Sequence, residues 1–417
     1  MRIPRPALLL GATAVLLLAL YARDFAAVPQ REIGRSDFTS SYVGASLLRE
    51  GEGHRLYDET LQGPLHASLI APDLEGNLPF VSPATQAVLA LPLTALDLAT
   101  AYRSLVLLQI LLLAVAVAIV VREAPWPTTT PRAVRLATGL AALAGTGTLS
   151  LVLLGQWDAI PALGLAVGYA AWRRGHRTAA GLALALGFCL VKPHLALGLA
   201  AFLLARRDRR LLAGAGLAVA GVVAVGLAVA GIQGSGDFLH ASLASTHRWN
   251  LAGFLGFTGL AGAWLDTGPA NALAAVGSIA AIVACAVMGN AWRRDDSLFE
   301  PALAGAAVLS LLASPHLLGH DLAILAPVAV IVTAWATARD GLATWPGQAA
   351  LRVLGLWLLI TLAARLDLGS ESPAPPGRLV PWALLLAAAA AMATCLNLPA
   401  GRTAPAARAP AATVAAP

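Results

Sequence analysis

Apolar segments of helical length recur along almost the whole chain and limit it to one broad fold class. A helix needs about 20 residues, or about 17 at the short end, to cross a bilayer. Blocks rich in Ala, Leu, Val and Gly recur from Ala7 to Asn397, with one soluble-sized gap between Arg23 and Ser82. They lack the alternation of a transmembrane strand, and backbone groups in lipid must be hydrogen-bonded internally. We therefore expect an all-α integral membrane protein, a polytopic helical bundle of about 11–13 spans.

Charged residues are too few to cover a surface that faces water. Only 12% of the 417 residues are charged and 58% are hydrophobic, whereas a soluble protein carries about 25% charged residues. The net charge of +6 comes from arginines scattered in short loops, which is typical of topology signals rather than of a nucleic-acid-binding face. Cys189, Cys285 and Cys395 lie in apolar stretches without metal or disulfide spacing, which predicts buried thiols.

The composition divides the chain into four parts. Residues 1–22 combine a basic start with an apolar run, which is typical of an uncleaved first transmembrane helix or of a cleaved signal peptide, and the multispan remainder favours the helix. Residues 23–82 carry mixed charge and are expected to form an outer loop. Residues 83–397 are expected to form a multi-span transmembrane domain, and the Ala/Pro-rich residues 398–417 a disordered tail.

Basic residues give the orientation of the spans, because Arg and Lys collect in short cytoplasmic loops. Six basic clusters separate the spans: Arg2/Arg5, Arg122 to Arg135, Arg173 to Arg177, Arg206 to Arg210, Arg293-Arg294 and Arg339. All six reach the cytoplasm if residues 84–97, a short segment broken by Pro92, are re-entrant or interfacial. The map predicts a multi-pass protein of the plasma membrane with polar side chains facing outward. Such groups at membrane depth are costly, which favours an outward-facing functional site.

Lys192 is the only lysine in the chain and is surrounded by apolar residues, with Pro193 and His194 directly after it. One interpretation is an interfacial anchor whose ammonium extends toward water. The other is a compact point charge that binds a phosphate, a role that lysine fills well. Pro193 is expected to end or kink the preceding helix there.

Asp37 follows the first span and precedes an expected helix over residues 38–50. It fits the N-cap of that helix, where Asp is favoured. A carboxylate at the membrane surface also fits a general base, and both interpretations can hold together. Tyr57 and Asp58 stand at the expected end of the next short segment and face the same compartment.

His316 and His320 lie four residues apart and therefore share one face of a helix. Such a pair without a third ligand is a weak metal pattern, so we assign no metal and no certain cofactor. A divalent cation is compatible with the pair but has no further support, and hydrogen bonding to an anionic lipid head group is favoured. Arg248 and Asn250 flank a tryptophan that suits sugar stacking, although an interfacial Trp needs no function.

Several segments, taken in order, resemble glycosyltransferase family 87. The matching segments are SDFTSSYVGASLLREGEGHRLYD, PFVSPATQAVLALPLTAL, GQWD, LALGFCLVKPHLALGLAAFLLARRDRR, RWNLAGFLG and SPHLLGHDLAILAP. The resemblance covers roughly residues 7–365 and rests on the order and spacing of these motifs. Three departures are Val81-Ser82-Pro83, where the family has an aromatic residue and two prolines, Asp158, where the Gly-Gln turn usually ends in Asn, and the loosely matched outer loop with Asn250.

The resemblance implies a GT-C architecture and a hexosyltransferase that uses a polyprenyl-phosphate sugar, commonly mannose, on the outer face of the membrane. It places Asp37 at the position of the catalytic Asp of the first loop. The transfer would invert at the donor phosphate, and the acceptor would be a glycolipid or polysaccharide, with membrane lipid but no nucleic acid as partner. We expect the substrate-binding residues to be Tyr57, Asp58, Gln156, Lys192, His194, Arg248, Asn250, His316 and His320.

The alternative function is a polyprenyl-lipid transporter or flippase without catalysis, with the same polar groups as its binding site. Transporters often contain two-fold internal repeats, and the sequence has no apparent repeat of fixed period. The large first outer loop with Asp37 favours the transferase, because a flippase has no evident use for it.

Overall fold

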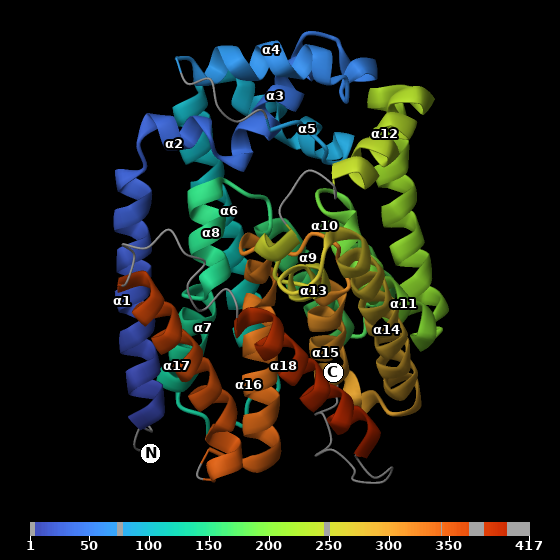
Figure 1. Ribbon diagram of the computed structural model, residues 1–417. Coiled ribbons are helices and arrows are strands. Elements are labelled where there is room, and N and C mark those ends of the chain that lie inside the picture. The colour runs from blue at the N-terminus through green and yellow to red at the C-terminus, as the bar shows by residue number, and fades with distance from the viewer. Residues whose placement is uncertain (1–4, 73–77, 246–250, 343, 367–378, 398–417) are drawn as a thin grey trace, which may run out of the picture.

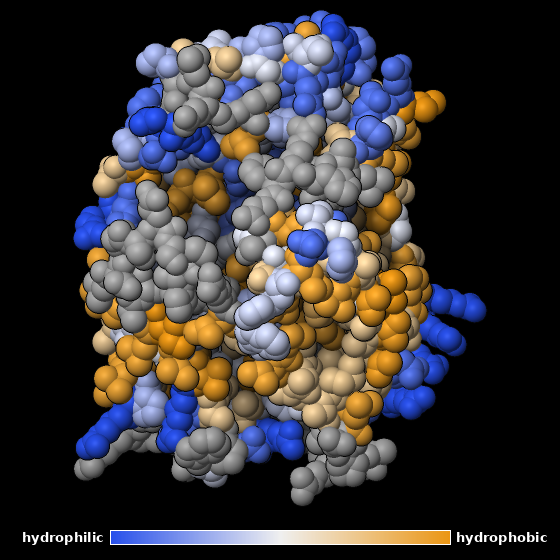
Figure 2. Space-filling view, in the orientation of Figure 1, coloured by the Kyte–Doolittle hydropathy of each residue, from blue (hydrophilic) through white to orange (hydrophobic). Residues whose placement is uncertain are grey.

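The computed structural model describes residues 5–72, 78–245, 251–342, 344–366 and 379–397, and these residues are helical with no strand among them. An end layer of short helices lies across a bundle of longer ones (Figure 1). Figure 2 shows apolar side chains around the middle of the molecule and hydrophilic ones gathered at its two ends. The polytopic all-α membrane fold expected from the sequence is confirmed. The expected tail at residues 398–417 lies outside the described residues.

The end layer contains six short helices that follow the first long one. They are α2 (Gln30–Gly34), α3 (Asp37–Arg49), the 3-10 helix η1 (Gly53–Arg55), α4 (Glu59–Ile70), α5 (Ala84–Ala90) and the 3-10 helix η2 (Leu91–Ala95). The segment interpreted above as re-entrant or interfacial is thus α5 with η2, and it packs on α3 in this layer (Figure 1). The hydroxyl of Tyr42 donates to the carbonyl of Leu96 at 2.7 Å, which ties α3 to the end of η2.

The remaining helices of the described residues build the bundle. They are α1 (Arg5–Ala27), α6 (Leu98–Glu123), α7 (Arg132–Leu143), α8 (Thr146–Leu154), α9 (Ala159–Arg173), α10 (Arg177–Cys189), η3 (Pro193–Ala196), α11 (Leu197–Arg206), α12 (Arg209–Ser245), η4 (Leu251–Gly253), α13 (Phe257–Gly262), α14 (Thr267–Arg294), η5 (Asp296–Leu298), α15 (Phe299–Leu312), η6 (His320–Leu325), α16 (Ala326–Asp340), α17 (Trp345–Leu366) and α18 (Val380–Asn397).

Fewer helices reach spanning length than the sequence suggested. Five in the described residues are long and apolar enough to cross a membrane: Arg5–Ala27, Leu98–Glu123, Arg209–Ser242, Thr267–Arg294 and His320–Asp340. The pair α7 and α8, which meet at 46°, gives a sixth if it is one bent span. The other expected spans are shorter helices. Every residue of α15 is buried, so this helix contacts protein rather than lipid and need not match the thickness of the bilayer.

The first helix packs into the bundle away from the largest core. Leu10, Leu17 and Tyr21 of α1 form a separate buried cluster with residues of α7 and α17, including Leu358. The hydroxyl of Tyr21 donates to the carbonyl of Ala144 at 2.9 Å, at the junction of α7 and α8. This contact joins α1 to the helix pair that leads into the site described next.

Candidate active site

Asp37 is the first residue of α3 and faces the loop between α8 and α9. Ser36, with extended backbone (φ −72°, ψ 155°), holds the N-cap position of α3, so the interpretation of Asp37 as the helix cap is wrong. The Asp37 carboxylate instead accepts a hydrogen bond from the side-chain amide of Gln156, with 2.6 Å between Nε2 and Oδ2. A residue of the end layer and a residue at the end of the bundle therefore meet here.

Gly155 allows the α8–α9 turn to approach α3 this closely. It ends α8 in the left-handed region at φ +63°, which glycine adopts without the steric cost of a Cβ. A Cβ at this position would lie 2.8 Å from the Cβ of Phe38 and 3.0 Å from the ring of Tyr102. Two features therefore require glycine at position 155: the left-handed backbone conformation and the lack of space for a Cβ.

Hydrogen bonds from neighbouring residues hold this turn against the end layer. The indole of Trp157 donates to the hydroxyl of Ser41 on α3 at 3.1 Å. Gln86 of α5 donates to the same hydroxyl at 2.8 Å. Tyr102 of α6 donates to the carbonyl of Val152 in the last turn of α8 at 2.7 Å. Gln156 therefore reaches Asp37 from a fixed position.

Lys192, just before η3, is buried between two carboxylates. Its ammonium lies 2.8 Å from Oδ1 of Asp158 and 2.7 Å from Oδ1 of Asp321. The other oxygen of Asp321 accepts the backbone N–H of Leu318 at 2.7 Å. Lys192 is only 8% exposed, so the interpretation as a water-seeking anchor is wrong. A buried ammonium needs such partners, because its desolvation is otherwise uncompensated. If all three groups are ionised, the cluster carries one net negative charge.

Three histidines surround the Asp158–Lys192–Asp321 cluster. The rings of His194 and His316 meet edge to face, with centroids 6.2 Å apart. Nε2 of His320 lies 3.7 Å from Oδ1 of Asp321. Nε2 of His316 and Nδ1 of His320 are buried without a hydrogen-bond partner among the described residues. Buried polar atoms are nearly always paired, so these two nitrogens are candidates to contact a substrate.

A metal site would compete with Lys192 for its carboxylates. Ligand atoms of Asp158, His320 and Asp321 all lie within 4.8 Å of one another, and carboxylate oxygen with imidazole is a donor set that suits several metals. However, the Lys192 ammonium already contacts an oxygen of each carboxylate. His316, the other member of the sequence pair, faces His194 and Phe254. We therefore assign no metal to these residues.

Asp37 and the Lys192 cluster are close enough to affect each other electrostatically. Burial raises the pKa of Asp37, while the hydrogen bond from Gln156 and the positive charge of Lys192 lower it, and the negative charge of Asp321 raises it. The net direction is upward. Asp37 is thus a stronger base than an exposed aspartate, and it belongs to the same site as the buried ion cluster.

The structure does not bring Tyr57 and Asp58 to this site. Asp58 caps α4 by accepting from the backbone of Thr60 at 2.9 Å, and it pairs with Arg55 at 2.7 Å. The hydrogen bonds from Thr60 and Arg55 lower the pKa of Asp58 to about 2. The hydroxyl of Tyr57 donates to the carbonyl of Ser82 at 3.0 Å. These contacts are within the end layer. Two further candidates, Arg248 and Asn250, lie outside the described residues.

Sequence reasoning did not identify Asp158 and Asp321 as the partners of Lys192. The two carboxylates lie 34 residues before Lys192 and 129 residues after it. The available signal was the apolar surroundings of Lys192, because a lysine buried there needs a counter-charge. Asp158 and Asp321 each stand beside apolar segments on the same predicted side of the membrane, so both were candidates for that role.

Comparison with known proteins identifies the family. The family model for glycosyltransferase family 87 matches residues 80–315, which is more than half of the chain and includes Gln156, Asp158 and Lys192. Asp37 and Asp321 lie outside the matched range. No curated protein and no solved structure gave a significant match. The sequence resemblance noted above is therefore confirmed: this helical membrane protein belongs to glycosyltransferase family 87.

Proposed function

We propose that this glycosyltransferase moves a hexose from a polyprenyl-phosphate donor to a lipid- or polysaccharide-linked acceptor on the outer face of the plasma membrane. Mannose is the sugar expected from the family resemblance. The observation that carries the proposal is the partly buried carboxylate of Asp37, held by Gln156 beside an ion cluster, where the end layer meets the bundle. A lipid-linked sugar phosphate is anchored in the bilayer, so a site beside the apolar band suits it (Figure 2).

Asp37 acts as the general base in this proposal. The acceptor hydroxyl gives its proton to the Asp37 carboxylate while the hydroxyl oxygen bonds to the anomeric carbon of the sugar. The bond from that carbon to the phosphate oxygen breaks, and its electron pair leaves on the polyprenyl phosphate. A single displacement of this kind inverts the anomeric configuration. Gln156 orients the carboxylate, and the raised pKa of Asp37 makes it a better proton acceptor near neutral pH.

In this proposal the ammonium of Lys192 stabilises the departing phosphate, although Asp158 and Asp321 offset part of its charge. An ammonium has three N–H donors; that of Lys192 donates a hydrogen bond to Asp321 and contacts Asp158 as an ion pair. A donor that is left binds a phosphate oxygen in this proposal, together with the unpartnered nitrogens of His316 and His320. Because two carboxylates offset its charge, Lys192 stabilises the phosphate less than an unpaired lysine would. Holding Asp158 and Asp321 in place is therefore an equally important role of Lys192.

The test is transfer of labelled sugar by purified protein. Wild-type protein in lipid vesicles is supplied with radiolabelled polyprenyl-phosphate-mannose and a panel of glycolipid acceptors. Asp37→Asn keeps the shape of the side chain but cannot take the proton, so it should lose at least about a hundredfold in rate. Asp97→Asn is the matched control, because Asp97 only caps α6 through Thr100 and is exposed.

Three outcomes contradict the proposal. Near-normal turnover by Asp37→Asn would remove Asp37 as the base. Transfer from a nucleotide sugar but not from any polyprenyl-phosphate sugar would change the class of donor. Movement of labelled lipid between the leaflets without any transfer would make the protein a flippase.

A further inference from the structure

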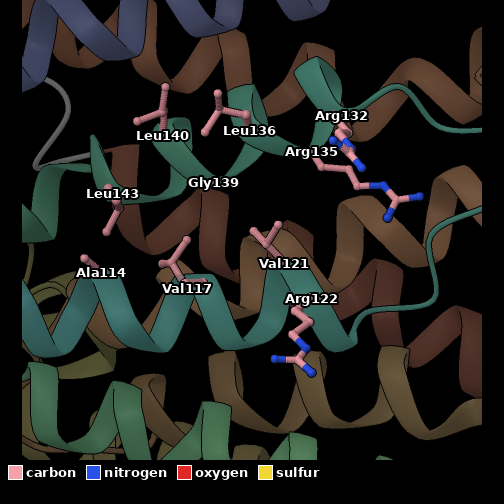
Figure 3. A pocket seen from close by; sticks show the side chains of 11 residues that line it. Ala114, Val117, Val121, Arg122, Arg132, Arg135, Leu136, Gly139, Leu140 and Leu143 are labelled. Atoms are coloured by element: carbon pink, nitrogen blue, oxygen red, sulfur yellow. The ribbon is translucent and has the colours of Figure 1, made fainter.

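A groove between α6 and α7 has the shape and charge of a lipid-binding site. Its volume is about 440 Å³. Apolar residues of both helices line it, among them Leu136 and Leu140 of α7, and Figure 3 shows Val117 and Val121 of α6 pointing toward α7. The lining runs along α6 from Ala114 to Arg122, about 12 Å at the rise of an α-helix. These walls suit part of an acyl chain.

Three arginines stand at one end of this groove: Arg122, Arg132 and Arg135 (Figure 3). Among the described residues that line the groove, none is acidic. Glu123, which is next in sequence to Arg122, makes ion pairs with both Arg122 at 3.6 Å and Arg174 at 2.5 Å. One carboxylate is therefore shared by two arginines, and the end of the groove keeps positive charge.

Arg135 is held in place at this end rather than extended into solvent. Its Nη2 donates to the carbonyl of Pro127 at 3.1 Å. Its guanidinium lies 6.0 Å from the centroid of the Trp126 ring. Its Nε is buried and has no hydrogen-bond partner among the described residues. A guanidinium fixed in this way and short of an acceptor is suited to a phosphate oxygen.

From these contacts we infer that the α6–α7 groove binds an anionic membrane phospholipid, with its phosphate at Arg122, Arg132 and Arg135 and an acyl chain along the apolar walls. Basic pockets between membrane helices commonly recognise anionic head groups. The sugar donor is a different lipid with a phosphate, and its site is at the other end of α6. The ring of Tyr102 lies 6.2 Å from that of Phe38, the neighbour of Asp37, and Arg122 is about 30 Å further along the helix.

Lipid retention by the full-length protein tests the inference. Wild-type protein is reconstituted in nanodiscs containing an excess of phosphatidylcholine over phosphatidylglycerol, and the lipids that remain after mild detergent extraction are counted by native mass spectrometry. Wild type should enrich phosphatidylglycerol at least about fivefold over the bilayer. Arg122→Gln with Arg132→Gln should lose that enrichment. Arg293→Gln with Arg294→Gln removes the same charge at the basic end of α14, outside the groove, and should keep it.

A second pair of variants tests the apolar walls without altering charge. Ala118→Phe fills the groove, where Ala118 lies on α6, and should reduce retention of phosphatidylglycerol as strongly as loss of the arginines. Ala220→Phe on α12, also at an exposed position, should not. Absence of enrichment in wild type, or equal loss in the Arg293/Arg294 control, would overturn the inference. Displacement of phosphatidylglycerol by added polyprenyl phosphate would also overturn it, because the groove would then take the carrier lipid.

Discussion

The two most unusual side chains of this protein owe their character to loss of water. Asp37 is partly buried with one amide partner, and Lys192 is buried with two carboxylates. Burial disfavours the charged form of any isolated group, so each needs a partner to remain ionised. Gln156 gives Asp37 a neutral partner, which leaves it basic, whereas Lys192 has charged partners, which hold it ionised. The pair thus combines a proton acceptor with a fixed charge.

The pH dependence of turnover should report the raised pKa of Asp37. The base form is present above that pKa and is lost as the pH falls through it, so kcat/KM should fall about tenfold per unit below an apparent pKa higher than the usual 3.9 or so. The hydrogen bond from Gln156 lowers the pKa. Gln156→Leu should therefore move the acidic limb to higher pH, as measured from rate profiles of both proteins. If the acidic limb of Gln156→Leu did not move, or moved to lower pH, Gln156 would not be lowering the pKa of Asp37.

Substitution of Lys192 should affect rate and stability in separable ways. Lys192→Ala should lose at least about tenfold in turnover, which is about 1.4 kcal/mol of barrier. It should also lose stability, because Asp158 and Asp321 are left buried without their cation. Lys192→Arg should recover only part of the rate. It keeps the positive charge, but the guanidinium is broader than the ammonium. The measurements are initial rates and thermal unfolding of the three proteins.

A double substitution separates the two effects of Lys192. Adding Asp158→Asn to Lys192→Ala removes one of the two uncompensated carboxylates, so stability should recover in part while turnover stays low. Full activity of Lys192→Ala, with only its unfolding temperature reduced, would give Lys192 a purely structural role.

The elements that position these side chains are short. The α8–α9 turn, the start of η3 and the start of η6 come from three separate parts of the bundle, and each places one or two polar groups at the same end. Their convergence depends on tight backbone contacts at glycines. A Cβ at Gly147 of α8 would lie 2.1 Å from the backbone nitrogen of Ala323 in η6, so these two elements touch without intervening side chains.

Gly155→Ala tests how much the α8–α9 turn contributes. The alanine faces a left-handed backbone, which costs about 1–2 kcal/mol, and a contact 2.8 Å from Phe38. Both the unfolding temperature and turnover should fall, because the turn must shift and carries Gln156 with it. Gly175→Ala is the control: φ is +80° and no atom lies within 4 Å of the added Cβ. Equal losses in both variants would show that only backbone conformation matters at Gly155.

Some element boundaries were predictable from the sequence, but the contacts between elements were not. The helix expected over residues 38–50 corresponds to Asp37–Arg49, and the short segment 84–97 corresponds to Ala84–Ala95, because such boundaries depend on local sequence. The ion pair of Lys192 with Asp321 joins residues 129 positions apart, and hydropathy carries no information on such pairing. Asp37 was identified as a candidate, yet its partner Gln156 became known only from the packing of the turn.

At the scale of the whole molecule, the face drawn in Figure 2 is polar at two ends and apolar between them. The end layer with the candidate site is at one end of the molecule. The first turn of α1 and the last turn of α18 are at the other end (Figure 1). This arrangement is compatible with the prediction that the basic loops all lie on one side of the membrane. The outward orientation of the site remains a prediction from those loops.

Cysteine labelling tests that orientation. In a variant with Cys189, Cys285 and Cys395 replaced by serine, His54→Cys should react with a membrane-impermeant thiol reagent added to intact cells, because the side chain of His54 in the end layer is 69% exposed. Arg207→Cys, between α11 and α12 and also exposed, should react only after the cells are opened. The reverse pattern would place the candidate site in the cytoplasm.

The packing of α1 has a consequence for the time course of synthesis. Its buried partners are in α7 and in α17, which begins at Trp345, whereas ribosomes make a chain from its N-terminus. Until α17 emerges, α1 must remain in the bilayer with lipid on the face that later becomes buried. The sequence of α1 is compatible with this, because both its exposed face (Leu8 and Leu9) and its buried face (Leu10) are apolar. We therefore expect the contact of α1 with α17 to form late, after most of the chain has been translated.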